Sequence, residues 1–88
     1  MADLVFSPEA DEVLTRMEAD DGQRSCAGRL NTALDLLEVE PGDARNRRRR
    51  FSTIGLWGIP VVCDDEEWLI LWEARDDVIV IHHIVIAP

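Results

Sequence analysis

The sequence predicts an α+β fold in two layers, with a helix hairpin packed on one face of a mostly antiparallel sheet. Apolar residues between positions 10 and 37 recur at the spacing of one helical face. Residues 56–86 instead form period-2 or continuous apolar runs rich in Val, Ile and Trp, which is typical of strands. No repeat or long linker divides the chain, so we expect one domain spanning residues 1–88.

A short apolar segment, Leu4–Phe6, predicts an N-terminal strand that leads directly into the first helix. The helix begins at Ser7, because a serine hydroxyl caps free backbone N–H groups and Pro8 presets the helical φ angle. The segment Asp20–Gly22 ends it. Its apolar face consists of Ala10, Val13, Leu14 and Met17.

The second helix is predicted to end before Pro41 and Gly42, since proline cannot continue the backbone hydrogen bonds. Two helices joined by a few residues form an antiparallel hairpin. Both are apolar on one side only, so both are expected to lie on the sheet. The apolar face of the second helix consists of Ala27, Leu30, Leu34 and Leu37.

Three strands are predicted at Leu56–Cys63, Trp68–Ala74 and Val78–Ile86, separated by acidic turns short enough for hairpins. Phe51–Ile54 adds a short strand before them. Pro60 has no backbone N–H to donate to a neighbouring strand, which confines its own strand to the far edge of the sheet or to a bulge. The last strand is apolar on both faces, so we expect it in a central position with the N-terminal strand beside it.

Composition excludes several classes of protein. The chain is 47% hydrophobic and 31% charged, as in globular domains, and its formal net charge is −9. No apolar run approaches the ~20 residues of a membrane helix, and the N-terminus lacks the pattern of a secretory signal. We therefore expect a cytoplasmic protein that does not associate with membranes.

Two cysteines, Cys26 and Cys63, are too few for a disulfide framework. Neither belongs to a CxxC or CxxH arrangement, so no zinc site is indicated. We expect two buried thiols that pack as small apolar groups. No metal and no cofactor is expected.

Arginines gather in one window, at Arg45, Arg47, Arg48, Arg49 and Arg50. The window carries +5, whereas residues 1–44 and 51–88 carry −8 and −6. Like charges held side by side repel unless a partner or water compensates them. The window either neutralises nearby acids as a solvated loop, or binds a nucleic acid or an acidic partner through guanidinium forks.

Adjacent histidines in the last predicted strand are candidates for proton transfer near neutral pH. In a regular strand His82 and His83 point to opposite faces, so they do not chelate one metal together. If the face with Val78, Val80, Ile84 and Ile86 packs on the helices, His83 lies on the open face. His83 is then the candidate catalytic residue, against the alternative of a hydrogen-bonded core or interface histidine.

Three tryptophans, Trp57, Trp68 and Trp72, are either core residues or part of a protein interface. Trp68, Ile70 and Trp72 share one strand face and form a large apolar ridge. If the helices leave this ridge uncovered, it is a surface for a protein partner or for a second copy of the chain.

The order strand, helix hairpin, basic segment and antiparallel meander resembles the RelE/ParE superfamily of bacterial toxin–antitoxin systems. The likeness runs nearly end to end and indicates a fold more than a catalytic motif. The segments that carry it are Phe6–Ala10, Leu30–Leu37 closing at Glu40-Pro41, Gly55–Trp57, and Trp68–Glu73 followed by Asp76–Ile81.

This resemblance implies either cleavage of messenger RNA on the ribosome or inhibition of DNA gyrase, with neutralisation by an antitoxin that wraps the toxin. The chain departs from the family pattern at two places. Gly58-Ile59-Pro60 follows Trp57 where the family has arginines on alternating positions. The C-terminal residues 84–88 lack the family's arginine with a nearby tyrosine or histidine. The ribonuclease residues are therefore expected to be lost.

The sequence thus favours a toxin-family protein that binds a protein or nucleic-acid partner and is held by an antitoxin on the open sheet face. One alternative is an active mRNA endoribonuclease that uses the arginine window and His83 against RNA on the ribosome. The other is a non-toxic module that forms a homodimer through the tryptophan ridge. The acidic net charge counts against ribosome or DNA binding, because phosphate affinity comes from many cationic contacts.

Overall fold

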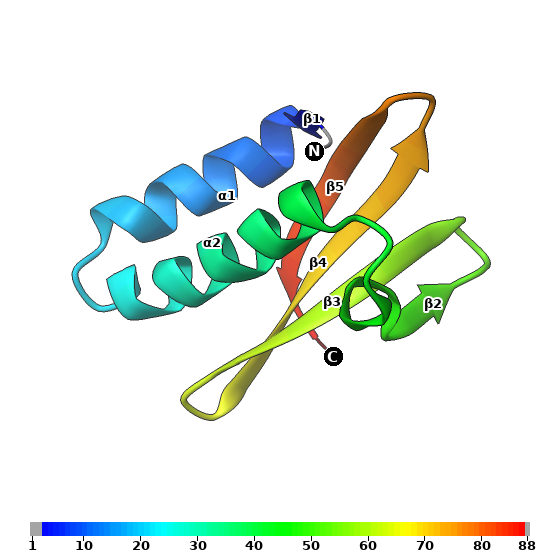
Figure 1. Cartoon of the computed structure of the whole chain (residues 1–88). Coiled ribbons are helices and arrows are strands. Elements are labelled where there is room, and N and C mark those ends of the chain that lie inside the picture. Colours follow the sequence, from blue (N-terminus) through cyan, green and yellow to red (C-terminus); the bar gives the residue numbers. More distant parts are fainter. Residues whose placement is uncertain (1–2, 88) are drawn as a thin grey trace.

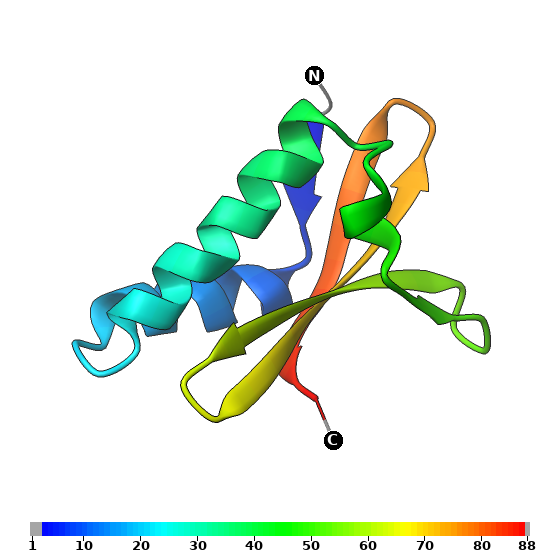
Figure 2. The ribbon, with the colours of Figure 1, turned by 60° about the horizontal axis from the view of Figure 1, so that its bottom comes forward.

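The computed structural model of the chain describes residues 3–87 and has the two predicted layers. Both helices lie on the same face of a five-stranded sheet (Figures 1 and 2). The elements are β1 (Asp3–Phe6), α1 (Pro8–Ala19), α2 (Arg24–Val39), the 3₁₀ helix η1 (Ala44–Arg47), β2 (Arg49–Phe51), β3 (Leu56–Cys63), β4 (Glu66–Arg75) and β5 (Val78–Ile86). The predicted α+β class is confirmed.

The strands follow one another across the sheet in the order β1-β5-β4-β3-β2. β1 pairs with β5 in parallel, and all other pairs are antiparallel. The N-terminal strand therefore lies beside the last one, as predicted, and β5 is an interior strand. The middle position belongs to β4.

Pro60 does not lie on the outermost strand, because β2 pairs with β3 at the far side of the sheet. This short strand is shifted from its predicted place at residues 51–54 to Arg49–Phe51. It pairs only with residues 56–58 of β3. Pro60 lies beyond that pairing, so its missing N–H removes no hydrogen bond from the outer ladder.

Ser7 joins the two layers where β1 ends and α1 begins. Its hydroxyl accepts a hydrogen bond from Ala10 N at 3.1 Å, which caps the helix, and donates one to the backbone oxygen of His82 at 2.7 Å. Its backbone N–H also donates to Ile81 O at 2.9 Å. The start of α1 is thereby fixed to the middle of β5.

The main core lies between the helices and the sheet and contains the predicted apolar faces of α1 and α2. The ridge of Trp68, Ile70 and Trp72 lies in this core, with Ile70 and Trp72 fully buried. A smaller cluster covers part of the helix-free face of the sheet. It consists of Leu56, Leu69 and Leu71, with Phe51 and Ala87 packed against them.

A β-bulge at His82 interrupts the pairing of β4 with β5. The register pairs Trp72 with Ile81 and Leu71 with His83, so His82 is one extra residue in β5. Because side chains alternate along a strand, one extra residue exchanges the two faces. The prediction of which β5 residues face the helices is therefore wrong for the part of the strand before the bulge. The β5 residues buried against the helices are Ile79, Ile81 and Ile84.

The same bulge corrects the prediction that the two histidines point to opposite faces. The ring centroids of His82 and His83 lie 6.3 Å apart, whereas side chains on opposite faces of a strand point away from each other. Pairing with Leu71 places His83 on the helix-free face.

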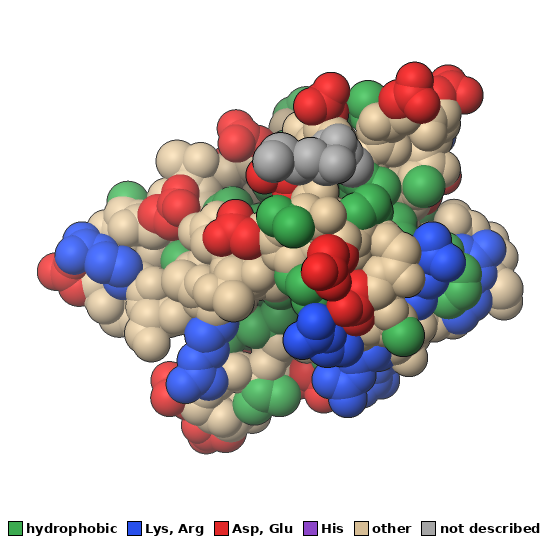
Figure 3. Space-filling view, in the orientation of Figure 1, with side chains coloured by type: hydrophobic (Ala, Val, Ile, Leu, Met, Phe, Trp, Pro, Cys, Tyr) green, Lys and Arg blue, Asp and Glu red, His purple; other side chains and the backbone are tan. Residues whose placement is uncertain are grey.

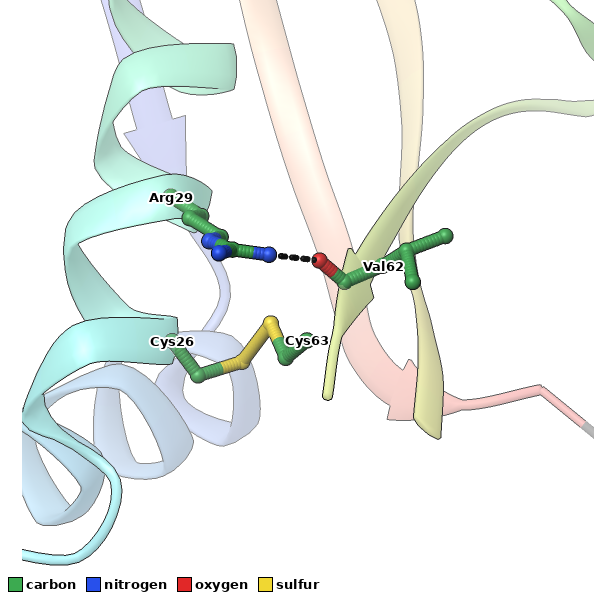
Figure 4. Close-up of a disulfide and its surroundings, with 4 residues drawn as sticks. All are labelled: Cys26, Arg29, Val62 and Cys63. Carbon is green, nitrogen blue, oxygen red and sulfur yellow. Dashed lines mark hydrogen bonds between the residues drawn. A yellow bond between two sulfur atoms is a disulfide. The ribbon is translucent and has the colours of Figure 1, made fainter. Parts of the chain in front are cut away.

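The expectation of two free thiols is wrong, because a disulfide joins Cys26 to Cys63 with 5.4 Å between their Cα atoms (Figure 4). One turn further along α2, Arg29 Nη1 donates a hydrogen bond to Val62 O at 2.7 Å. Together these bonds attach the first half of α2 to the end of β3. Spacing in the sequence did not reveal the pair, since the two cysteines are 37 positions apart.

Cytoplasmic location stays a prediction, and disulfides are uncommon in that reducing compartment. Within residues 3–87, the helices are all too short or too polar to cross a membrane.

Candidate functional site

Asn46 anchors the arginine window to the core. It is the one buried polar residue among those described, with 1% of its surface exposed. Its Nδ2 donates to Glu40 O at 2.7 Å, and its backbone oxygen accepts a hydrogen bond from Trp72 Nε1 at 2.8 Å. The sequence analysis missed this role, although Asn46 is the only residue of the window 45–50 that is not arginine. Its anchoring leaves the surrounding arginines at the surface.

Arg45 is already paired within the chain. The Asp43 carboxylate accepts hydrogen bonds from the backbone N–H of Arg45 at 2.8 Å and from its Nε and Nη2 at 3.0 and 2.9 Å. These side-chain and backbone bonds hold the pKa of Asp43 well below its usual range, and the same contact raises the pKa of Arg45. Of the five arginines predicted to bind a partner, Arg45 therefore has its guanidinium occupied.

Trp57 lies half-buried at the edge of the core and orders two other arginines. The guanidinium carbon of Arg50 lies 4.6 Å from the centroid of the indole, and that of Arg47 lies 5.6 Å from it. Such cation–π contacts hold a guanidinium over the ring and leave its N–H edge for another acceptor. Trp57 thus supports the arginines and does not offer a bare aromatic face.

Arg49 forms an ion pair with Glu67 across β3, at 2.7 Å. Within residues 3–87, Arg47, Arg48 and Arg50 form no ion pair with a carboxylate. We call the surface formed by Arg47–Arg50 the arginine segment. Beside it is an open hollow of about 560 Å³, lined by Arg48, Arg49, Arg50, Phe51 and Pro60. Figure 3 shows basic side chains gathered over η1 and β2, where this segment lies.

Each histidine has a carboxylate neighbour. His82 Nε2 lies 2.9 Å from Glu73 Oε1, and this hydrogen bond is the main cause that lowers the pKa of Glu73, with Arg75 adding a smaller effect. His83 Nδ1 lies 3.5 Å from Glu9 Oε2 at the start of α1. The two rings are therefore tied to acids of β4 and α1.

The predicted catalytic histidine does not lie beside the arginine segment. His83, Leu71, Gly58 and Arg49 form one row across β5, β4, β3 and β2. Three strand spacings of about 4.8 Å separate the two ends of this row, so the backbones of His83 and Arg49 lie about 14 Å apart. A general acid–base group and a phosphate-binding cation can act on the same phosphate only when both lie within hydrogen-bond reach of it.

Trp68 and Trp72 were predicted as interface residues if the helices left them uncovered. The helices cover both side chains, so core packing is the correct alternative for these two. Trp57 alone of the three reaches the surface, beneath Arg47 and Arg50.

No group of three or more His, Cys, Asp or Glu side chains within residues 3–87 has an arrangement suited to a metal ion. Comparisons with protein-family models, curated proteins and solved structures gave no match to this chain.

Proposed function

We propose that this chain is a divergent RelE/ParE-like toxin-family protein that acts by binding an anionic partner and not by cleaving RNA. The fold agrees with what that resemblance implies: an N-terminal strand, a helix hairpin on one face, and a meander whose last strand pairs with the first. Its partner is a protein with an acidic segment or a nucleic acid, and an antitoxin holds it.

One observation carries the proposal. Three arginines, Arg47, Arg48 and Arg50, are held together at the surface of an acidic protein, and no carboxylate within residues 3–87 forms an ion pair with them. Adjacent like charges repel, so an anion that contacts all three gains attraction and relieves that repulsion. Arginine forks suit carboxylates and phosphates equally in geometry.

The separation of His83 from the arginine segment supports the non-catalytic form of the proposal. The residues suggested for a nuclease lie at opposite ends of a four-strand row, and the side chain of Arg49 pairs with Glu67. A phosphate bound by the arginines is therefore far from the imidazole of His83.

The test is expression in bacterial cells without the neighbouring genes. We expect wild-type expression to arrest growth and the triple variant R47A/R48A/R50A to relieve the arrest. The matched control is R16A/R24A, which removes two exposed arginines of the helices. Harmless wild-type expression, or equal arrest by the triple variant, contradicts the proposal. RNA cleavage by the purified wild type that His83→Ala abolishes contradicts its non-catalytic form.

A further inference from the structure

We propose that two copies of this chain associate along β3, with the acidic turn of each copy bound to the arginine segment of the other. We call Asp64–Glu66, which comprises the turn between β3 and β4 and the first residue of β4, the acidic turn. This inference concerns self-association and does not rest on the proposed toxin activity, although it uses the same arginines.

Opposite charges lie at opposite ends of β3. Arg49 pairs with Gly58 near one end of the strand, and Asp64 follows the other end directly. The six steps from Gly58 to Asp64 span about 20 Å of extended backbone. Figure 3 shows acidic side chains at the β3–β4 turn and basic ones over β2 and η1.

Within residues 3–87 the acidic turn forms no ion pair, and Arg29, which lines a small hollow with Asp64, donates to Val62 O. Asp64, Asp65 and Glu66 are exposed, and none of the ion pairs within residues 3–87 includes them. Arg49 of the arginine segment reaches Glu67, which follows the acidic turn directly. Within residues 3–87, Arg47, Arg48 and Arg50 form no ion pair with the acidic turn of their own copy. A second copy brings them together.

A two-fold axis brings the acidic turn of each copy to the arginine segment of the other copy at the same time. When two copies of β3 lie antiparallel, the acidic end of each strand faces the arginine end of the other. An axis near Val62 turns the acidic turn of the second copy toward Pro60, which lines the hollow next to the arginine segment, without backbone pairing between the copies. The same contact then repeats at the other end, as a two-fold interface requires.

At the outer edge of β3 two copies are expected to contact each other through side chains, and not through a sheet that continues from one copy into the other. β2 leaves residues 59–63 without a partner on that edge. Pro60 has no N–H to donate, and Val62 O already accepts a hydrogen bond from Arg29. An intermolecular ladder is therefore blocked at these two positions, and the charged ends carry the association. We expect a weak dimer with a dissociation constant on the order of 0.1 mM.

Single-stranded nucleic acid is a poorer occupant of this surface. Its binding relies on aromatic faces on which bases stack. Arg47 and Arg50 cover Trp57, and Phe51 packs against the cluster on the helix-free face. The surface therefore offers one half-buried aromatic residue, Phe51, beside the arginines.

Charge exchange tests the dimer. One variant is R47E/R48E/R50E, and the other is D65R/E66R, which keeps Asp64 because its φ of 56° forms the turn. Molar mass is measured by sedimentation equilibrium, from about tenfold below to about tenfold above the expected dissociation constant. We expect a concentration-dependent dimer for wild type and monomers for each variant alone. An equimolar mixture of the two variants should regain the dimer, because both contacts then join opposite charges again.

The control variant D35R/D77R makes the same charge change as D65R/E66R at two exposed acids away from β3, and it should dimerise as wild type does. Circular dichroism confirms that each variant is folded. Single charge reversals, R48E and D65R, replace any multiple variant that does not fold. Wild type that stays monomeric throughout overturns the proposal. So does a dimer that survives either exchange, or a mixture that stays monomeric. None of these outcomes depends on growth arrest, so failure of the dimer and failure of the proposed function are separate.

Discussion

The indole nitrogen of Trp72 donates a hydrogen bond to the backbone oxygen of Asn46, 2.8 Å away, in the buried layer between helices and sheet. This contact connects the centre of β4 to the arginine window, 26 positions earlier in the chain. The side chain of Asn46 continues the link to Glu40 O at the end of α2. The position of η1, and with it the arginine segment, therefore depends on one buried residue.

Asn46→Ala is expected to destabilise the fold by about 0.5–1.5 kcal/mol, because it removes the partly buried hydrogen bond from Asn46 Nδ2 to Glu40 O. Urea unfolding followed by circular dichroism measures the change. Asn31→Ala is the control, since Asn31 donates only to an exposed Glu18 carboxylate, and it should cost less than about 0.5 kcal/mol. Equal stability of Asn46→Ala and wild type contradicts the anchoring role.

Trp57 and Arg50 are expected to be energetically coupled. In a double-mutant cycle with Trp57→Leu and Arg50→Ala, the coupling energy should be about 0.5–1 kcal/mol, the size of an exposed cation–π contact. Unfolding free energies of the four proteins give the value. Arg48→Ala in place of Arg50→Ala is the control, because no contact of Arg48 with the ring is found. Additive effects of Trp57→Leu and Arg50→Ala would count against the stacking.

Removing the disulfide is expected to lower stability by about 2–4 kcal/mol, since the bond restricts the unfolded chain over a 37-residue separation. Thermal unfolding with and without a thiol reductant measures this. Wild type should lose at least ~10 °C in Tm on reduction, and C26S/C63S should unfold at the same temperature in both conditions. A wild-type Tm that ignores the reductant shows that the bond is absent or without effect.

Glu73 is expected to make the free energy of unfolding depend on pH. Its pKa is lowered in the folded protein, chiefly by the hydrogen bond with His82, so its contribution is present above the ordinary glutamate pKa of 4.5. That contribution is lost as the pH falls through the lowered pKa of the folded state. The stability difference between wild type and Glu73→Gln should therefore shrink on acidification below pH 4.5.

An NMR titration of the Glu73 side chain checks the cause. His82→Ala should raise the pKa of Glu73 toward its ordinary value, and Arg75→Ala should raise it less, because Arg75 contributes the smaller effect. An unchanged pKa in His82→Ala would mean that the 2.9 Å contact is not made in solution.

Local signals in the sequence located most of the fold. The strands Leu56–Cys63 and Val78–Ile86 have the predicted bounds, because acidic turns delimit long apolar runs. Ser7 caps α1 as expected from its place before Pro8. The pairing of β1 with β5 followed from a last strand that is apolar on both faces.

Features set by contacts between distant segments were not predictable in the same way. The bulge at His82 is set by the pairing of β4 with β5, and the two adjacent polar residues His82 and His83 hide the change of face in the pattern of β5. The disulfide depends on how α2 lies against β3, which no spacing of two cysteines specifies. Likewise, the sequence located the basic cluster, but only packing shows that Arg45 and Arg49 have partners and that Trp57 supports Arg47 and Arg50.

The two hydrogen bonds of the Ser7 hydroxyl have a consequence for how the chain assembles. The hydroxyl caps the start of α1 and also donates a hydrogen bond to His82 O, at the bulge of β5, 75 positions away. A β5 that slipped by one residue would withdraw the His82 carbonyl from that hydroxyl and leave the helix start unattached to the sheet. An error in the register of β5 therefore also releases the start of α1 from the sheet. Formation of the first helix is in this way coupled to correct pairing of the last strand.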